Sequence, residues 1–153
     1  MMLGGFVAGG VMRGIIVGFL VFLTSCFFVS YELHHWFIML IVLVLVSSVF
    51  ALAGFTNAML ARNFDDIMLI PTFVLTPLTY LGGVFFSTSM LPPVWEKLSY
   101  FNPILYMVNA FRYGMLGQSS VHISIAISII SGMLIFFWIS NIILMHKGIG
   151  LRE

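Results

Sequence analysis

The chain has 153 residues, of which 61% are hydrophobic and 7% are charged, and its formal net charge is +1. A soluble domain carries about 25% charged residues, so this composition excludes an ordinary soluble protein. No block of like charges is present, and therefore no nucleic-acid partner and no soluble appendage are predicted.

Four long uncharged runs dominate the sequence, at 14–31, 33–61, 67–95 and 113–146. Each is long enough for an α-helix that crosses the hydrocarbon core, which needs about 20 residues. The runs are continuously apolar and lack a period of two, which favours helices over a β-barrel. We therefore predict an all-α, polytopic helical membrane protein in which residues 1–153 form a single transmembrane domain and the lipid bilayer is the surrounding medium.

The first span is predicted at 14–29, opened by Arg13. A glycine at every fourth position, Gly10, Gly14 and Gly18, lets a second helix approach closely, although glycine is also simply common in membrane helices. The same segment resembles a lipoprotein signal that ends at Cys26. Because apolar residues follow Cys26, we interpret it instead as a residue that packs as a small hydrophobe.

Two adjacent histidines, His34 and His35, stand in the first loop. Neighbouring side chains on a helix or strand point apart, and no cluster of cysteines or carboxylates supports this pair. No metal site and no cofactor are predicted.

The second span is predicted at 37–60, with Ser47, Ala51, Gly54 and Ala58 as a candidate packing face. It ends at the clustered charged and polar residues Arg62, Asn63, Phe64, Asp65 and Asp66. One interpretation is a solvated loop whose carboxylates lie near the positive N-terminal end of the next helix. The other is a contact surface for a cytoplasmic partner.

The third span is predicted at 67–86 and contains two prolines, Pro71 and Pro77. Prolines bend a membrane helix and leave carbonyl groups without a donor. The hydroxyl groups of nearby threonines can satisfy these carbonyls, and the candidates are Thr72, Thr76 and Thr79. The pair Gly82-Gly83 loosens the helix just before it leaves the membrane.

The segment 91–116 is predicted to be re-entrant. Pro92-Pro93 and Asn102-Pro103 are turn signals, and only 14 uncharged residues separate Lys97 from Arg112, too few to cross. Arg112 at the bilayer centre would cost about 3 kcal/mol on insertion scales. We expect a helix over 103–116 that returns to the side it came from, followed by the last span at 123–145.

The basic residues predict the orientation. If the first span runs from inside to outside, two basic residues are external, Lys97 and Arg112. Four are then cytoplasmic, namely Arg13, Arg62, Lys147 and Arg152. Positive charge is enriched on the cytoplasmic side, so both termini are predicted to be cytoplasmic, and the hairpin over 91–116 extracellular.

The sequence carries no signature of an enzyme. It has no GxxxxGK[ST] loop, no HExxH, no paired carboxylates within a span and no plausible nucleophile–base pair. No catalytic residue is predicted, and the chain is not expected to hydrolyse ATP by itself.

A family resemblance covers 61–117 and extends over almost the whole chain through Met12-Arg13-Gly14 and the tail at 148–152. The sequence resembles the C-terminal part of the type-2 ATP-binding-cassette permeases, the membrane subunits of bacterial exporters. The matching pieces are Phe64-Asp65-Asp66, Pro71-Thr72-Phe73, the run from Thr76 to Phe86, Leu91-Pro92-Pro93, Phe101-Asn102-Pro103 and Phe111-Arg112-Tyr113.

The resemblance implies a permease subunit in a bacterial inner (plasma) membrane, which pairs with a second permease subunit as a homodimer. Each subunit would sit on a separate ATPase subunit and move a drug-like, lipid-linked or saccharide substrate outward. The ATPase contact would be Arg62–Asp66. The extracellular gate would include Gly82, Gly83, Phe85, Pro92, Pro93, Asn102, Pro103 and Arg112.

The chain also departs from the family pattern. A complete member has six spans, and two of them precede the position of Arg13 together with an interfacial helix and a coupling helix. The expectation is therefore a partial permease whose N-terminal half is missing or supplied separately. The alternative is a non-transporting truncated remnant or membrane scaffold fragment.

Overall fold

The computed structural model describes residues 2–28, 35–84 and 92–148, and these contain helices and turns but no strand. Four helical segments are long and apolar enough to cross a membrane. They are α1 (Met2–Cys26), α2 (Trp36–Leu60), the composite segment Phe64–Leu81, and α7 (Ile123–His146). The prediction of an all-helical chain with four candidate spans is confirmed.

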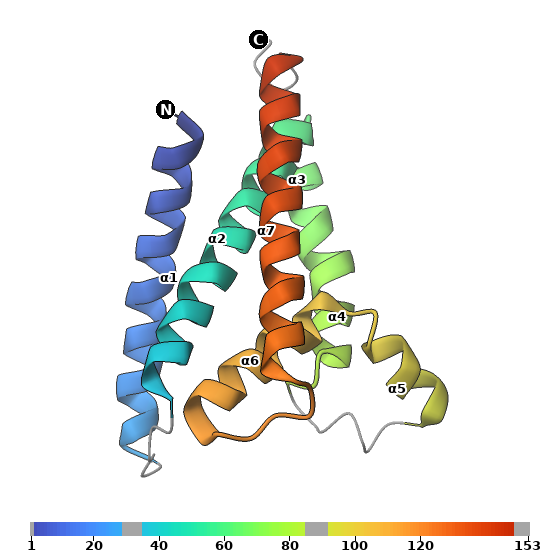
Figure 1. The fold of residues 1–153 in the computed structure, drawn as a ribbon. Coiled ribbons are helices and arrows are strands. Elements are labelled where there is room, and N and C mark those ends of the chain that lie inside the picture. Colours follow the sequence, from blue (N-terminus) through green and yellow to red (C-terminus); the bar gives the residue numbers. More distant parts are fainter. Residues whose placement is uncertain (1, 29–34, 85–91, 149–153) are drawn as a thin grey trace.

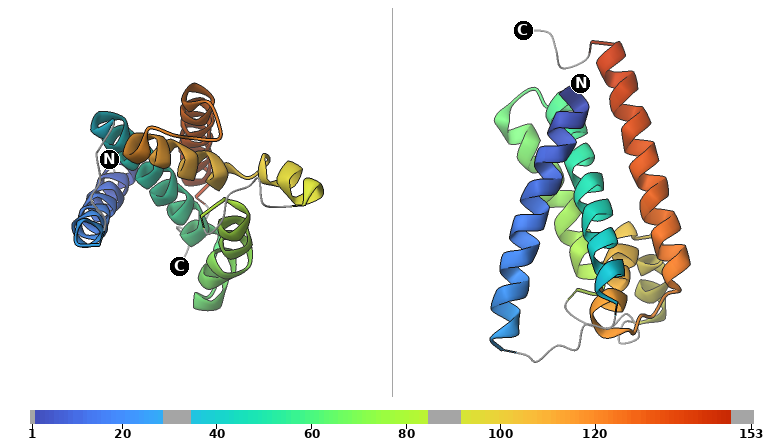
Figure 2. Two further views of the ribbon diagram at one scale, coloured as in Figure 1. Left: turned by 90° about the horizontal axis from the view of Figure 1, so that it is seen from below. Right: turned by 60° about the vertical axis from the view of Figure 1, so that its left-hand side comes forward.

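The four segments run between two distinct ends of the molecule (Figure 1). The start of α1, the end of α2 and the end of α7 lie at one end. The short helices α5 (Pro93–Ser99) and α6 (Pro103–Leu116) lie at the opposite end, close to the start of α7. The central helix is α2, which contacts α1 on one side and α6 and α7 on the other (Figure 2).

The contact between α1 and α2 depends on the predicted glycine stripe. A Cβ added at Gly10 would lie 2.5 Å from the Cβ of Ala51, and one at Gly18 would lie 3.0 Å from Leu43. Gly14 faces Ser47 more closely still. Gly10 and Gly14 thus meet small residues of α2, and Gly18 makes room for Leu43. The predicted packing roles of Gly10, Gly14 and Gly18 are confirmed.

Three details of the first two helices differ from the prediction. α1 begins at Met2, so Arg13 lies inside the helix, where it is exposed, and does not open it. Cys26 is exposed and does not pack as a buried hydrophobe. Gly54 and Ala58 are exposed as well, so the packing face of α2 toward α1 does not include them. The predicted end of the first span, at 29, lies outside the described residues.

The hydrophobic core lies where α2, α6 and α7 meet. Its buried members are Val42, Val49, Met107, Ala110, Ala126 and Ile130. One buried polar link joins α2 to α7. Asn141, which is 0% exposed, donates from Nδ2 to the Leu52 carbonyl at 3.0 Å and accepts from the Thr56 hydroxyl at 2.9 Å. Both bonds of the buried Asn141 amide reach α2, so they favour the observed register of the two helices.

The third membrane segment is interrupted where the prolines stand. It comprises α3 (Phe64–Ile70), the π-helical turn η1 (Pro71–Leu75) and α4 (Thr76–Leu81). The wider π turn makes room for the ring of Pro77, which would otherwise collide with the preceding turn. The Thr76 hydroxyl donates to the Pro71 carbonyl at 3.2 Å, and the Thr79 hydroxyl donates to the Leu75 carbonyl at 2.7 Å. These are not the carbonyls that Pro71 and Pro77 leave without an N–H donor, which belong to Ile67 and Phe73, four residues earlier. The Ile67 carbonyl accepts the Asn57 Nδ2 instead, at 2.9 Å, so the predicted role of the threonines is not borne out. The predicted end of the span, at 86, lies outside the described residues.

Candidate functional site

The end of α4 approaches the start of α6 through two glycines. Gly82 is buried, and a Cβ there would lie 2.8 Å from the Ile104 Cγ2 and 3.1 Å from the Leu78 carbonyl oxygen. Gly83 has φ +74°, in the left-handed region that side chains disfavour. Position 82 requires glycine because Ile104 lies too close for a side chain, and position 83 favours glycine because of its positive φ. We call this contact between α4 and α6 the α4–α6 junction.

Asn102 ties the two helices together at this junction. Its side chain is 3% exposed. The Nδ2 atom donates to the Leu78 carbonyl at 2.5 Å, and the Oδ1 atom accepts the Ile104 backbone N–H at 3.0 Å. The same amide therefore caps α6 and satisfies a carbonyl of α4. Pro103 follows at the first helical position, where its missing N–H costs nothing.

Arg112 closes the junction from the far end of α6. Its Nη2 atom donates to the Gly83 carbonyl at 3.0 Å. The structure thus brings together five of the residues predicted for the extracellular gate: Gly82, Gly83, Asn102, Pro103 and Arg112. Ile104, against which Gly82 packs, was not predicted, because an apolar residue after Asn-Pro carries no distinguishing signal.

Two other predicted gate residues, Pro92 and Pro93, do not join this cluster. Pro92 and Pro93 are exposed and start α5, where the Pro92 carbonyl accepts the N–H groups of Trp95 and Glu96 at 2.9 and 3.0 Å. Their structural role is to set the beginning of α5. Phe85 lies outside the described residues.

Two further contacts fix α6, and the site prediction did not include their residues. Asn109 is 2% exposed, and its Oδ1 atom accepts the Ser120 N–H at 3.0 Å. Gly114 packs on the start of α2, where a Cβ would lie 2.9 Å from the Met39 Cα, and its carbonyl accepts the His35 N–H at 3.1 Å. The signal for Gly114 is only a lone glycine within an apolar helix.

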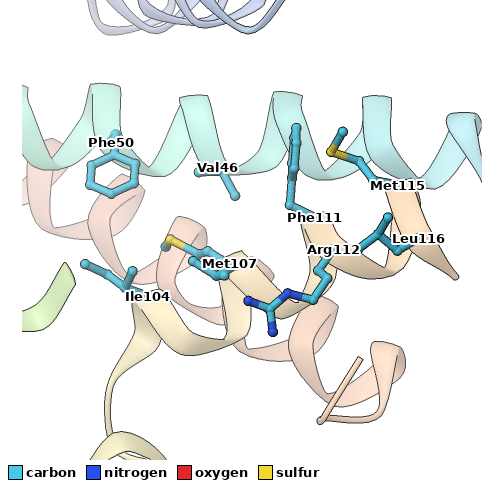
Figure 3. Close-up of a pocket in the computed structure, with 9 residues that line it drawn as sticks. Val46, Phe50, Ile104, Met107, Phe111, Arg112, Met115 and Leu116 are labelled. Carbon is cyan, nitrogen blue, oxygen red and sulfur yellow. The ribbon is translucent and has the colours of Figure 1, made fainter. Parts of the chain in front are cut away.

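An apolar groove runs along the contact of α2 with α6 (Figure 3). Its volume is about 440 Å³, and Arg112 is the one charged residue among the described residues that line it. The guanidinium group lies on the α6 side of the groove (Figure 3). The apolar lining includes Val46, Phe50, Ile104, Met107 and Phe111.

The predicted ATPase contact lies at the opposite end, between α2 and α3 (Figure 1). The Asp66 Oδ2 atom accepts the backbone N–H groups of Arg62 at 3.0 Å and Asn63 at 3.2 Å, so this carboxylate caps the turn into α3. Arg62, Asp65 and Phe64 are exposed, and Phe64 is 73% exposed. Asp66 fits the interpretation of a solvated loop with a carboxylate near the start of the next helix, and the Asn63 side chain caps the same helix. The exposed Arg62, Phe64 and Asp65 side chains are accessible to a partner.

Among the described residues, no group of three or more His, Cys, Asp or Glu side chains could hold a metal ion. His35 lies instead against Tyr113, with ring centroids 5.2 Å apart in a stacked arrangement. Neither the junction nor the groove offers a reactive pair of groups. Their chemistry is that of packing, hydrogen bonding and one cation beside apolar surface.

Four apolar spans and a short helical pair at one end define a polytopic helical membrane protein. The sequence profile of the ABC-2 type transporter family matches residues 1–116, and the chain belongs to that family. It is 47% identical to the inner membrane transport permease YadH of Escherichia coli K12 over 151 residues, 99% of this chain and 59% of the relative.

Two more distant relatives share the name nodulation protein J. The protein from Rhizobium leguminosarum bv. viciae is 27% identical over 99 residues, 63% of this chain and 38% of the relative. The protein from Sinorhizobium fredii is 34% identical over 87 residues, 50% of this chain and 33% of the relative. The chain thus spans 59% of the length of YadH and smaller shares of these relatives. No solved structure matches.

Proposed function

We propose that this chain is all or part of the membrane-spanning permease subunit of an ATP-binding-cassette exporter in a bacterial inner membrane. A separate subunit hydrolyses ATP, and the substrate moved outward is drug-like, lipid-linked or saccharide. The observation that carries the proposal is the 47% identity to a transport permease over 99% of this chain. At that identity, the two proteins are expected to share the arrangement of their membrane-spanning helices and therefore the role of carrying a substrate across the membrane.

The proposed orientation places both termini in the cytoplasm. Arg62 follows the end of α2 and Lys147 follows the end of α7, and Figure 1 shows both of these helix ends at the end of the molecule where α1 begins. Positive charge next to spans favours the cytoplasmic side. Arg13 lies beside Ala51, in the half of α2 nearer to that same end, and its long side chain can reach toward that surface.

At the opposite, extracellular end we assign α5 and α6 to a re-entrant hairpin that gates the exit. The 14 residues of α6 rise only about 21 Å, less than the roughly 30 Å of the hydrocarbon core. α6 runs antiparallel to the first half of α2, with Gly114 at Met39 and Ile104 in the groove beside Phe50. Such a helix dips inward at its start and returns at its end.

Two partners complete the proposed machine. A second permease subunit, or the part of a permease that this chain does not include, packs against the exposed faces of the spans. The ATPase subunit contacts the loop Arg62–Asp66, where four residues are exposed and the Asp66 carboxylate accepts two backbone N–H groups. A surface loop whose backbone is already held in place suits a protein contact, because the backbone does not have to become ordered on binding.

The ATPase contact is tested by capture from native membranes. The tagged chain is expected to co-purify with a protein that carries a GxxxxGK[ST] loop. Asp65→Ala is expected to reduce the captured amount at least fivefold. The control is Glu96→Ala on α5, which removes a carboxylate at the other end and is expected to change nothing. Absence of any ATPase from the captured material would contradict the proposed function.

The orientation and the hairpin are tested by cysteine labelling after Cys26→Ala. Lys97→Cys and Ser120→Cys, which flank α6, are both expected to react with an impermeant reagent added outside the cell. Arg62→Cys and His146→Cys are expected to react only after permeabilisation. Labelling at just one of the two flanking positions would show that α6 crosses the membrane.

A further inference from the structure

The groove between α2 and α6 combines one cation with an otherwise apolar wall. Its volume of about 440 Å³ falls in the range of roughly 300–1,000 Å³ that is usual for ligand pockets. A guanidinium group at the edge of apolar surface is unfavourable without an anion, because both the charge and its donors need partners. Arg112 therefore indicates that the ligand of the groove carries a negative charge.

The guanidinium group of Arg112 retains unused hydrogen-bonding capacity. It has five N–H donors. Its bond to the Gly83 carbonyl uses Nη2, and the side chain is half-buried at the groove. The remaining donors form a fork that matches a phosphate or carboxylate group in a bidentate arrangement.

The positions of the lining residues along α2 give the groove a direction. Gly114, two residues after Arg112, packs on Met39 near the start of α2. Phe50 and Ile104 lie at the other end of the groove, beside the middle of α2. The cation is thus nearer than Ile104 to the end of α2 at Met39, and the apolar wall continues toward the middle of α2. In the proposed orientation, the end at Met39 is the one that faces the lipid headgroups. A phospholipid has the same order, with its charge outside and its chains inside.

We propose that this groove binds an anionic phospholipid of the surrounding membrane, with its phosphate on Arg112 and an acyl chain along Val46, Phe50 and Met107. A second copy that packs in the groove through one of its long helices or α6 supplies no anion. α1, α2, α6 and α7 contain no acidic residue, so a copy packed in the groove through these helices would leave the cation unpaired. This inference does not depend on the proposed transport function.

The test is native mass spectrometry of the full chain, extracted in detergent and incubated with phosphatidylglycerol or phosphatidylcholine. We expect the wild type to retain phosphatidylglycerol at least fivefold better than phosphatidylcholine. Arg112→Gln is expected to abolish that preference, and Arg112→Lys to keep part of it, because lysine keeps the charge without the fork. Lys97→Gln, a cation on α5 at the same end, is the matched control and is expected to keep the full preference.

A second variant separates ligand binding from folding, since Arg112→Gln also loses the bond to Gly83. Val108→Trp fills the groove and leaves Arg112 in place, and it is expected to lower phosphatidylglycerol retention at least threefold. Equal retention of the two lipids by the wild type would overturn the proposal. So would unchanged retention in Val108→Trp, or a dimer that excludes lipid from the groove.

Discussion

The two ends of the molecule are built in different ways. At the α4–α6 junction, Asn102 bonds to Leu78, 24 residues away, and Arg112 bonds to Gly83, 29 residues away. At the turn into α3, Asp66 bonds to backbone groups only three and four residues away. The junction therefore holds separate helices together, whereas the turn shapes itself and leaves its other side chains exposed. A change at the junction should disturb the fold, and a change at the turn should disturb what binds there.

The largest expected effect is at Asn102. Replacing it with leucine keeps the volume but removes both bonds, leaving the Leu78 carbonyl and the Ile104 N–H without side-chain partners. We expect a loss of about 2–4 kcal/mol in the free energy of unfolding, since each unsatisfied buried group costs about 1–3 kcal/mol. Thermal unfolding in detergent measures this loss.

The control for Asn102→Leu is Gln118→Leu, which changes an exposed amide just after α6. Its stability is expected to stay within about 0.5 kcal/mol of the wild type. Equal stability of the two variants would mean that the junction is not what holds α6 against α4.

An intermediate effect is expected at Gly82. Alanine there would place a Cβ 2.8 Å from the Ile104 Cγ2, an overpacking that costs about 1–3 kcal/mol. Ile104→Ala in the same chain removes the colliding group, so the two changes should be strongly non-additive. The control is Gly132→Ala on α7, where nothing lies within 4 Å of the added Cβ, and stability should hold or rise slightly. Additive losses at Gly82 and Ile104 would contradict the close approach of α4 and α6.

The sequence predicts what is local or periodic in this fold. Uninterrupted apolar runs predict the four candidate spans, and four-residue spacing predicts the stripe at Gly10, Gly14 and Gly18. The prediction places the beginning of the first span at Arg13, because this charge bounds the uncharged run, whereas α1 begins at Met2 and Arg13 lies inside it. The charge that bounds an apolar run therefore does not mark where the helix begins.

The contacts at the α4–α6 junction are predicted only in part by the sequence. Turn signals and family resemblance singled out Gly82, Gly83, Asn102 and Arg112 as a group. Neither indicated that the Arg112 guanidinium would meet the Gly83 carbonyl, because that bond depends on how α4 and α6 are placed in space. Two-residue signals such as Asn-Pro fix local geometry, whereas the partner of a long side chain is set by the tertiary fold.

The smallest effects on stability are expected at the turn into α3. Of its two neighbouring aspartates, Asp66 bonds to the backbone of the turn and Asp65 is exposed. Asp66→Ala removes the acceptor of the Arg62 and Asn63 N–H groups and should cost about 0.5–2 kcal/mol, the usual range for losing a cap. Asp65→Ala removes an exposed carboxylate and should stay within about 0.5 kcal/mol of the wild type. Thermal unfolding of both variants should rank them in this order, while ATPase capture should fall in Asp65→Ala despite its normal stability. A drop in stability for Asp65→Ala as large as that for Asp66→Ala would contradict this prediction. It would mean that Asp65 also stabilises the fold, as the residues of the α4–α6 junction do.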